Sequence, residues 1–341
     1  MSDEPWIFRG PQDRPRIQAE LDDRGYARFH APELLGMTGD PPAICRLLFG
    51  AEPLRMRCQE IRPDPRDPLR TGYWRSIREA KIHTDGPALG IPPSALVMLC
   101  KQPAAEAGDT LLLDTWALLR VIEAEDPALF AALFRVPRRL QFAEADHWGP
   151  TVSLRRGHLI AYHPPFPDPA CDIARRFQVF VDRAPKVQFR SAAGEVFLVN
   201  NHRCLHGRLA FEDLGRTFVR VMLWLPDPFT APADFKARAI EGSAQLAADL
   251  AGEPRWLRER FGVDVPAPSP AALERLRLAI DLLQRPRETI DLPPAEAREL
   301  CELQDRLLSS CLPALGEALP PLEERLALTE RALAVLRSRG D

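Results

Sequence analysis

Short apolar runs separated by turn residues fill the chain from Gly25 to about Pro228. Residues 25–29 alternate between apolar and polar side chains, which predicts a half-buried strand, and residues 94–100 form a nearly continuous apolar run, typical of a buried strand. Similar runs predict further strands at 110–114, 159–162, 187–190, 195–200 and 217–225. Many short strands within one region favour a barrel or jelly roll.

Helical periodicity interrupts and then replaces this pattern. Apolar residues at helical spacing predict one helix at about 116–134, and a second helix is expected at 169–183. From about residue 233 the chain is rich in Ala, Leu, Glu and Arg, and Leu322, Leu326, Thr329, Leu333 and Leu336 follow the seam spacing of packed helices. Residues 1–20 are polar and interrupted by prolines, so we expect a loose arm there.

The predicted organisation is therefore α+β overall. After the arm at 1–20, a mainly β jelly-roll domain with flanking helices spans 21–230, and a C-terminal α-helical extension spans 231–341. The extension is expected to act as a lid, a dimerisation element or a docking site for a partner.

Composition excludes several classes of protein. The net charge of -3 over 341 residues leaves no basic surface of the kind that nucleic-acid binders need. The N-terminus has no signal-peptide pattern, and no stretch is apolar enough to cross a membrane. The seven cysteines show no C-x-x-C spacing, which predicts free thiols and a cytoplasmic location rather than a disulfide or zinc framework.

The candidate chemistry begins with His83 and Asp85. On a strand, residues i and i+2 point to the same side, so this short segment can offer an imidazole and a carboxylate to one ion. His206 is the best candidate for a third ligand, because it is expected where a strand ends. Two imidazoles and one carboxylate suit a non-heme Fe(II) site with open positions, although zinc accepts the same ligands.

Arg220 supplies the second half of the pattern. It is the one charged residue in the middle of the apolar run 217–225. An unpaired guanidinium that is buried on both sides costs several kcal/mol. Three explanations are open from the residues alone: a bound dicarboxylate, an internal ion pair with a distant Asp or Glu, or an edge strand that faces solvent.

A family resemblance covers roughly residues 20–228. It is carried by His83-Thr84-Asp85-Gly86, by Ala107-Gly108-Asp109-Thr110, by the segment 201–208 ending in His206-Gly207-Arg208, and by Arg216 and Arg220. In order and spacing these motifs resemble the taurine dioxygenase and clavaminate synthase-like family. The resemblance implies a double-stranded β-helix (jelly-roll) core that uses Fe(II), with 2-oxoglutarate and O2 as cosubstrates.

The resemblance also implies roles for individual residues. His83, Asp85 and His206 match the iron ligands, and Thr110 matches a residue that hydrogen-bonds a 2-oxoglutarate carboxylate. Arg220 matches the arginine that binds the distal carboxylate, with Arg216 as a second arginine close by. The chain departs from the pattern before the distal histidine, where relatives often have Asp-Asn-Arg and this chain has Asn-Asn-His at 200–202.

The expected activity is hydroxylation of an unactivated C–H bond in a small polar metabolite, an amino acid or a specialised-metabolite intermediate, with release of succinate and CO2. Tyr73, Trp74, Glu79 and Trp148 are candidate substrate contacts, and a homodimer or a carrier protein is a candidate partner for the C-terminal helices. No contact with nucleic acid or membrane is expected. Two rivals stay open: a zinc-dependent jelly-roll hydrolase or isomerase, and a non-catalytic binding module that acts through its helical extension.

Overall fold

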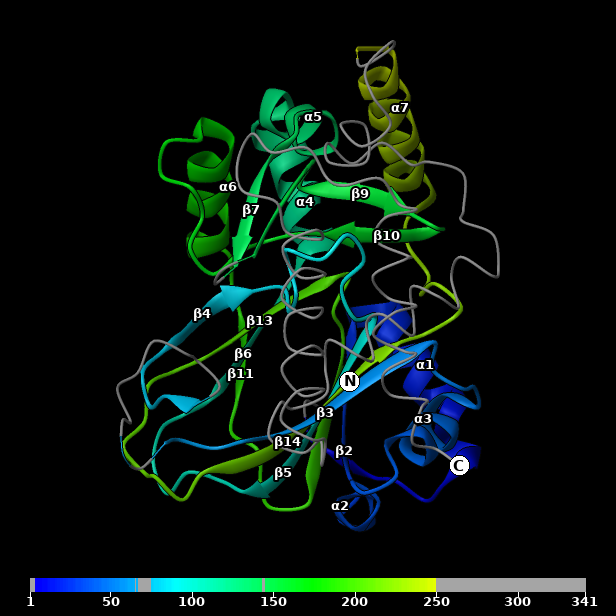
Figure 1. The fold of residues 1–341 in the computed structure, drawn as a ribbon, viewed down its shortest axis with the longest axis vertical. Helices are drawn as coiled ribbons and strands as arrows, with labels where there is room; N and C mark the ends of the chain where they lie inside the picture. Colours follow the sequence, from blue (N-terminus) through cyan, green and yellow to red (C-terminus); the bar gives the residue numbers. More distant parts are fainter. Residues whose placement is uncertain (1–3, 65, 67–74, 143–144, 250–341) are drawn as a thin grey trace, which may run out of the picture. The chain divides into compact units, whose positions relative to one another are not determined.

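Two β-sheets form the centre of the computed structural model, which describes residues 4–64, 66, 75–142 and 145–249 (Figure 1). The larger sheet has the strand order β1 (Trp6–Ile7), β2 (Tyr26–His30), β12 (Glu195–Asn200), β5 (Ala95–Gln102), β14 (Thr217–Trp224) and β3 (Arg55–Ile61). The smaller sheet has the order β11 (Val187–Phe189), β6 (Thr110–Asp114), β13 (Cys204–Arg208) and β4 (Ala80–His83). All the strand pairs in these two sheets are antiparallel except that of β1 with β2.

One apolar cluster joins the two sheets. Phe197 and Phe218 of the larger sheet share it with Leu112 and Phe189 of the smaller one. Because neighbouring residues of a strand point to opposite faces, this cluster identifies which side chains of each strand look into the space between the sheets. The same alternation gives the direction of the candidate site residues that lie on these strands.

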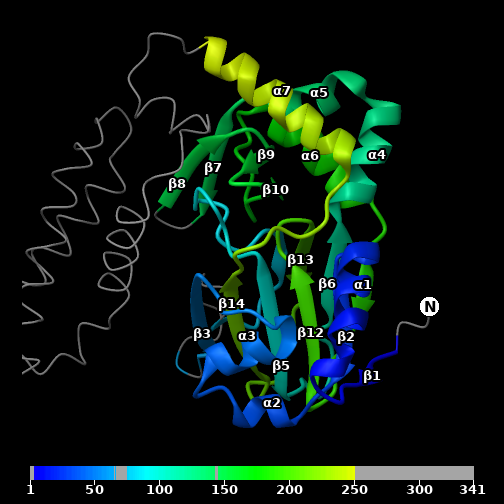
Figure 2. The ribbon, with the colours of Figure 1, turned by 90° about the vertical axis from the view of Figure 1, so that its right-hand side faces the viewer.

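Helices pack against the outer face of the larger sheet and against one end of the smaller sheet (Figure 1). The outer face of the larger sheet packs against α1 (Arg14–Arg24), α2 (Glu33–Gly36) and α3 (Pro41–Phe49), through a cluster that includes Leu21, Leu34 and Leu48 (Figure 2). A second cluster joins Leu113 and Leu205 of the smaller sheet to the helices α4 (Thr115–Glu125), α5 (Pro127–Arg135), α6 (Asp172–Arg183) and α7 (Ala233–Asp249).

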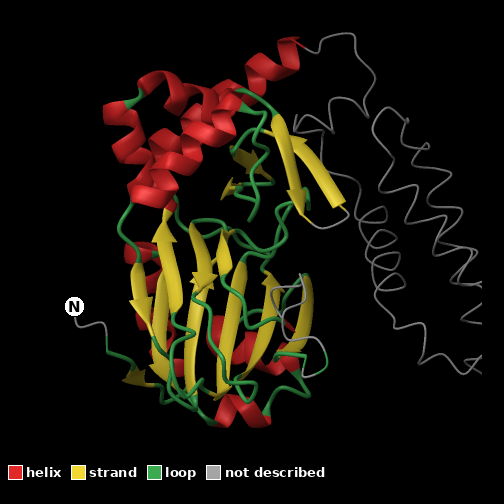
Figure 3. Cartoon of the chain, turned by 90° about the vertical axis from the view of Figure 1, so that its left-hand side faces the viewer, coloured by secondary structure: helices red, strands yellow, loops and turns green. Residues whose placement is uncertain are grey.

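Two hairpin-like pairs lie near these last helices (Figure 3). They are β7 (Arg138–Phe142) with β8 (Ala145–Gly149), and β9 (Val152–Arg155) with β10 (His158–Ala161). The predicted mainly β core with flanking helices is thus confirmed. None of the helices in the described ranges combines the length and the apolar character that a membrane span requires.

The single helix predicted at 116–134 is two helices. Asp126 ends α4 and also begins α5, where its carboxylate accepts a hydrogen bond from the Leu129 amide at 3.0 Å. Pro127 explains the break, because proline has no amide hydrogen and disfavours a helical conformation in the residue before it.

The N-terminal segment differs from the loose arm expected at residues 1–20. Trp6 and Ile7 extend the larger sheet as β1, and α1 begins at Arg14 with a proline in its first turn, where the missing amide hydrogen costs nothing. Ile17 and Leu21 are 1% exposed, so burial of one apolar face holds this helix on the sheet.

The expected helical extension begins inside the β domain's own compact unit, which includes residues 1–253. Phe235 of α7 is fully buried, with ring contacts to Trp116, Phe130 and Phe134. The remainder of the extension, with the apolar seam at 322–336, lies outside the described residues.

Arg203 ties helix α1 to the smaller sheet. Its guanidinium bonds the Asp114 carboxylate at 2.6 and 2.8 Å and donates to the carbonyls of Asp22 and Asp23, each at 2.7 Å. We expect Arg203→Ala to lower the free energy of unfolding by about 3–5 kcal/mol, because the Asp114 carboxylate and two helix carbonyls lose their partner. Urea unfolding followed by circular dichroism measures this change.

The matched control is Arg175→Ala, which removes an ion pair with Asp172 in which both side chains are about 60% exposed. Such a surface pair contributes about 0–1 kcal/mol. Equal losses in the two variants would contradict the structural role of Arg203.

Candidate metal centre

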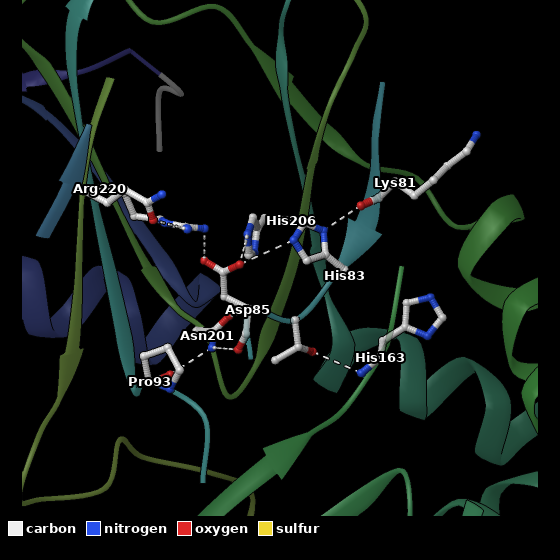
Figure 4. Close-up of polar contacts among 10 residues, drawn as sticks. Lys81, His83, Asp85, Pro93, His163, Asn201, His206 and Arg220 are labelled. Atoms are coloured by element: carbon white, nitrogen blue, oxygen red, sulfur yellow. Dashed lines mark hydrogen bonds and ion pairs between the residues drawn. The ribbon is translucent and has the colours of Figure 1, made fainter. Parts of the chain in front are cut away.

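His83, Asp85 and His206 converge on one point between the sheets. Each offers one ligand atom, and these three atoms lie within 4.8 Å of one another. The Asp85 Oδ1 atom is 3.5 Å from His83 Nε2 and 3.9 Å from His206 Nε2 (Figure 4). The three predicted metal ligands are therefore brought together, although the two histidines are far apart in the sequence.

Strand pairing explains why the two imidazoles meet. His206 of β13 lies directly opposite His83 of β4 on one side and opposite Leu112 of β6 on the other. Directly opposed side chains share a face, and Leu112 belongs to the cluster between the sheets, so both imidazoles point inward. Gly207 permits the close approach of β4, because a Cβ there would stand 2.8 Å from the Ala80 carbonyl oxygen.

Protonation states also suit a cation. The Lys81 carbonyl lies 2.7 Å from His83 Nδ1 and can accept a proton from it, which leaves Nε2 as the ring nitrogen on the side of Asp85. Burial and the nearby His83 lower the pKa of His206 to about 3, which keeps its imidazole neutral at physiological pH. Neutral imidazole is the form that binds metals.

Asp85 is ionised despite its burial. Burial alone would raise the pKa of this carboxyl, but Arg220 and the two imidazoles outweigh it and hold the pKa well below its ordinary value. Arg220 Nη1 donates to Asp85 Oδ2 at 2.6 Å, and the Asp85 amide donates to Asn201 Oδ1 at 2.9 Å. Arg220 thus holds one carboxylate oxygen, Asn201 holds the backbone amide, and the second carboxylate oxygen faces the imidazoles, as expected of a preformed metal ligand.

Arg220 thus has an internal carboxylate partner, one of the alternatives left open by the sequence. Its second Nη atom donates to Gln59 Oε1 at 3.1 Å, and its Nε atom is buried without a hydrogen-bond partner. The guanidinium therefore lies next to the metal ligands rather than at a distance from them.

Arg216 occupies a different place on the same strand side. It is 5% exposed and stacks on Phe218 at 4.2 Å and on Phe211 at 5.2 Å, measured from guanidinium carbon to ring centroid. Burial lowers its pKa to about 10. No carboxylate in the described part of the chain pairs with it, so this buried cation lacks an anion.

Two further residues converge on the same region. The guanidinium of Arg208 stands 4.5 Å from the Phe211 ring, and burial together with Arg216 lowers its pKa to about 9. Thr110 is 5% exposed and lies directly opposite Arg208 in the smaller sheet, so the two side chains share the inner face. Arg208 donates to the carbonyls of Ser76 and Arg78, which leaves Arg216 as the cation without a polar partner.

Two of the four predicted substrate residues lie in the part of the chain that the structure describes. Tyr73 and Trp74 lie outside the described residues. Glu79 is 43% exposed and pairs with Lys81 at 2.7 Å, a surface contact. Trp148 lies on β8 opposite Arg139. His202, four residues before His206, is buried with its Nε2 atom 3.0 Å from the Pro92 carbonyl oxygen.

Sequence reasoning missed Asn201, Gln59 and Arg208 as parts of the site. Asn201 also donates to the carbonyls of Asp85 and Pro93 at 3.1 and 2.9 Å, so it fixes the backbone that carries the metal carboxylate. Asn201 and Arg208 flank His206 within one motif of the sequence. Nothing in that motif distinguishes a residue of the site from a residue with a purely structural role. No sequence pattern indicates a role for Gln59, because only the pairing of β3 with β14 brings it beside Arg220.

Several solved structures and one family model match this chain. Similar solved structures include an asparagine oxygenase (16% identity, 64% of this chain and 79% of that one, TM-score 0.49) and the non-heme iron oxygenase OrfP (16%, 63% and 84%, TM-score 0.43). Another is a taurine dioxygenase from Burkholderia xenovorans (18%, 62% and 81%, TM-score 0.42).

A family model described as "Taurine catabolism dioxygenase TauD, TfdA family" matches residues 11–222. The match covers more than half of the 341 residues and includes all three metal-ligand candidates. The chain therefore belongs to the taurine catabolism dioxygenase (TauD, TfdA) family.

Proposed function

We propose that this protein is an Fe(II)- and 2-oxoglutarate-dependent dioxygenase that hydroxylates an unactivated C–H bond of a small polar metabolite, an amino acid or a specialised-metabolite intermediate. The observation that carries the proposal is the inward-facing cluster of His83, Asp85 and His206. Two imidazoles and one carboxylate on one side of an ion are the ligand set of non-heme Fe(II) oxygenases.

The donor set fits the metal by its chemistry. His83 and His206 would bind it through Nε2, and Asp85 through Oδ1, while Oδ2 stays with Arg220. When bound, the Fe(II) supplies O2 activation coupled to oxidative decarboxylation of 2-oxoglutarate, which yields succinate, CO2 and the hydroxylated substrate. The chain itself holds the ligands in place and excludes bulk water, since His83 and Asp85 are only 6% and 5% exposed.

For 2-oxoglutarate, the structure favours Arg216 over Arg220 as the group that binds the distal carboxylate. Arg220 is already bonded to Asp85, whereas Arg216 is buried without an anion and lies in the region of Thr110 and Arg208. A carboxylate received there would gain a charge-assisted bond from arginine and a hydroxyl donor from Thr110. This reverses the order of importance that the family resemblance implied for the two arginines.

The rival functions explain less of the site. A zinc hydrolase or isomerase would use the same three ligands but would leave the Arg216 guanidinium without an anion. A binding module that acts through the C-terminal helices would not need a buried neutral imidazole, that of His206, beside an ionised, buried carboxylate.

Anaerobic reconstitution tests the proposal. We expect Fe(II) with 2-oxoglutarate to give a weak visible charge-transfer band in the purified protein, and subsequent O2 to give succinate. Zn(II) in place of Fe(II) serves as the control and should give neither. A protein that binds Fe(II) but gives no band with 2-oxoglutarate would not be an enzyme of this kind.

Two broader assignments belong to the same proposal. We place the protein in the cytoplasm because Cys45, Cys58, Cys100, Cys171 and Cys204 are free thiols, as a reducing compartment maintains them. We assign a lid, dimer or carrier-docking role to residues 250–341 from their helical sequence pattern alone.

A further inference from the structure

Four consecutive carbonyl oxygens, shortly after the candidate metal carboxylate, each lie within hydrogen-bond distance of a side-chain donor. They belong to the segment 86–93, which connects β4 to β5 and contains neither helix nor strand. The pairs, in chain order of the carbonyls, are Tyr162 Oη with Gly90 at 2.6 Å, Trp224 Nε1 with Ile91 at 2.9 Å, His202 Nε2 with Pro92 at 3.0 Å and Asn201 Nδ2 with Pro93 at 2.9 Å.

The segment 86–93 depends on these side chains because of its prolines. Pro87, Pro92 and Pro93 have no amide hydrogen, so they cannot form the regular backbone ladder of a strand or helix. Pro92 and Pro93 are buried, and a buried carbonyl without a donor is costly. Donors from three other places in the fold, namely the residue after β10, the end of β14 and the turn between β12 and β13, therefore hold the segment.

The segment is tied to Asp85 at both of its ends. Gly86 follows Asp85 directly and has a φ of +69°, in the left-handed region that favours glycine, and a Cβ there would stand 3.3 Å from Pro93 Cδ. The Asn201 side chain bonds the Asp85 amide at 2.9 Å, the Asp85 carbonyl at 3.1 Å and the Pro93 carbonyl (Figure 4). A shift of the segment would therefore move the main chain that carries the metal carboxylate.

His202 is the residue at which this chain departs from the family pattern, since relatives often have arginine there. It is 3% exposed, and its ring meets that of His158 edge-on with 5.2 Å between the centroids. It is not part of the cluster formed by His83, Asp85 and His206. Its polar contact is with the segment 86–93 instead, through the Pro92 carbonyl.

We propose that His202, Tyr162 and Trp224 are positioning residues for the metal carboxylate. They hold the segment 86–93 in place, and through it they hold Asp85 where its carboxylate faces both imidazoles. The inference rests on the proposed oxygenase function and adds residues to the same site. Loss of an outer partner of a metal ligand commonly weakens metal binding or activity by about 10–100-fold.

Co(II) binding to the metal-free full-length protein, followed by visible ligand-field absorption, tests the role of His202. We expect His202→Phe, which keeps a ring but removes the donor, to weaken Co(II) binding by about tenfold or more. His202→Gln keeps a donor but loses the ring, and it should recover most of the affinity. Better binding by the phenylalanine variant than by the glutamine variant would show that the ring only packs, and would overturn the inference.

Tyr162→Phe is the milder second variant, because it removes one hydroxyl and keeps the ring. We expect it to weaken Co(II) binding by about threefold to tenfold, the effect of one hydrogen bond. The matched control is Ser153→Ala, which removes a buried hydroxyl that bonds the Pro150 carbonyl at 3.3 Å, and it should bind Co(II) like the wild type. Urea unfolding shows whether each variant is folded.

The double variant of Tyr162→Phe and His202→Phe tests whether both residues act through one segment. Its loss of affinity should be smaller than the product of the two single losses, because the first change already releases the segment. Co(II) affinities within about twofold of the wild type in both single variants would overturn the inference. If His202→Phe does not fold, the result for Tyr162→Phe decides.

The two proposals fail separately. Absence of the Fe(II)–2-oxoglutarate band in the wild type refutes the oxygenase function. A normal band in the wild type, combined with unchanged Co(II) binding in Tyr162→Phe and His202→Phe, refutes the positioning role alone.

Discussion

Asp85→Ala is expected to abolish succinate formation and to reduce Fe(II) affinity by more than about 10²-fold. Losing an outer partner of a metal ligand already costs about 10–100-fold, and Asp85 is the only carboxylate among the three candidate ligands. Anaerobic Fe(II) titration gives the affinity, and succinate assays give the turnover.

The alanine variant also leaves Arg220 without its carboxylate, which is 2.6 Å away in the structure. Asp85→Asn separates the two effects, because the amide keeps the shape and a hydrogen-bond acceptor for Arg220 but lacks the negative charge. We expect this variant to fold normally by circular dichroism and to remain inactive. Asp182→Ala, on the exposed side of α6, is the control for a lost surface carboxylate. Substantial turnover by Asp85→Asn would show that the iron is held elsewhere.

Arg216→Gln is expected to raise the dissociation constant of 2-oxoglutarate by about 10²-fold. A bidentate, charge-assisted pair in a buried place contributes roughly 1.5–3 kcal/mol, and each 1.4 kcal/mol is a factor of ten. The charge-transfer band, titrated with 2-oxoglutarate under anaerobic conditions, reports this constant directly. Arg216→Lys should recover part of the affinity, since it restores the charge but not the two parallel donors.

The comparison with Arg220→Gln decides between the two arginines. If Arg216 binds the distal carboxylate, Arg220→Gln should change the 2-oxoglutarate constant much less than Arg216→Gln does. The reverse order would restore Arg220 as the anchor, as the family resemblance implied.

The strands and the metal ligands were predictable because each left a local pattern. Apolar runs of four to eight residues specify buried strands, and the His-x-Asp spacing places two ligands on one side of a strand. The N-terminal helix was not predictable from periodicity, because Pro11 and Pro15 gave the segment the composition of an irregular arm. Only the contact of Ile17 and Leu21 with the sheet shows that the helix is part of the core.

The helix break at Asp126 was readable in principle. An aspartate followed by proline is a helix start signal, and here it outweighs an apolar periodicity that continues across the break. The surroundings of the substrate candidates Glu79 and Trp148, in contrast, could not be predicted from the sequence. Glu79 pairs with Lys81 at the surface and Trp148 lies on β8, contacts that depend on strand pairing and that the sequence does not reveal.

The sequence by itself determined the β core, the identity of His83, Asp85 and His206, and the presence of arginines able to hold an anion. These follow from residue type and short spacing, which the chain carries locally. Only the tertiary structure decided which groups the two arginines contact. Arg220 bonds Asp85 and Gln59, whereas Arg216 is buried and has no anionic partner in the described part of the chain. This difference between the two arginines arises from the sheet register. The register brings together residues more than 130 positions apart, and no short sequence pattern reveals it.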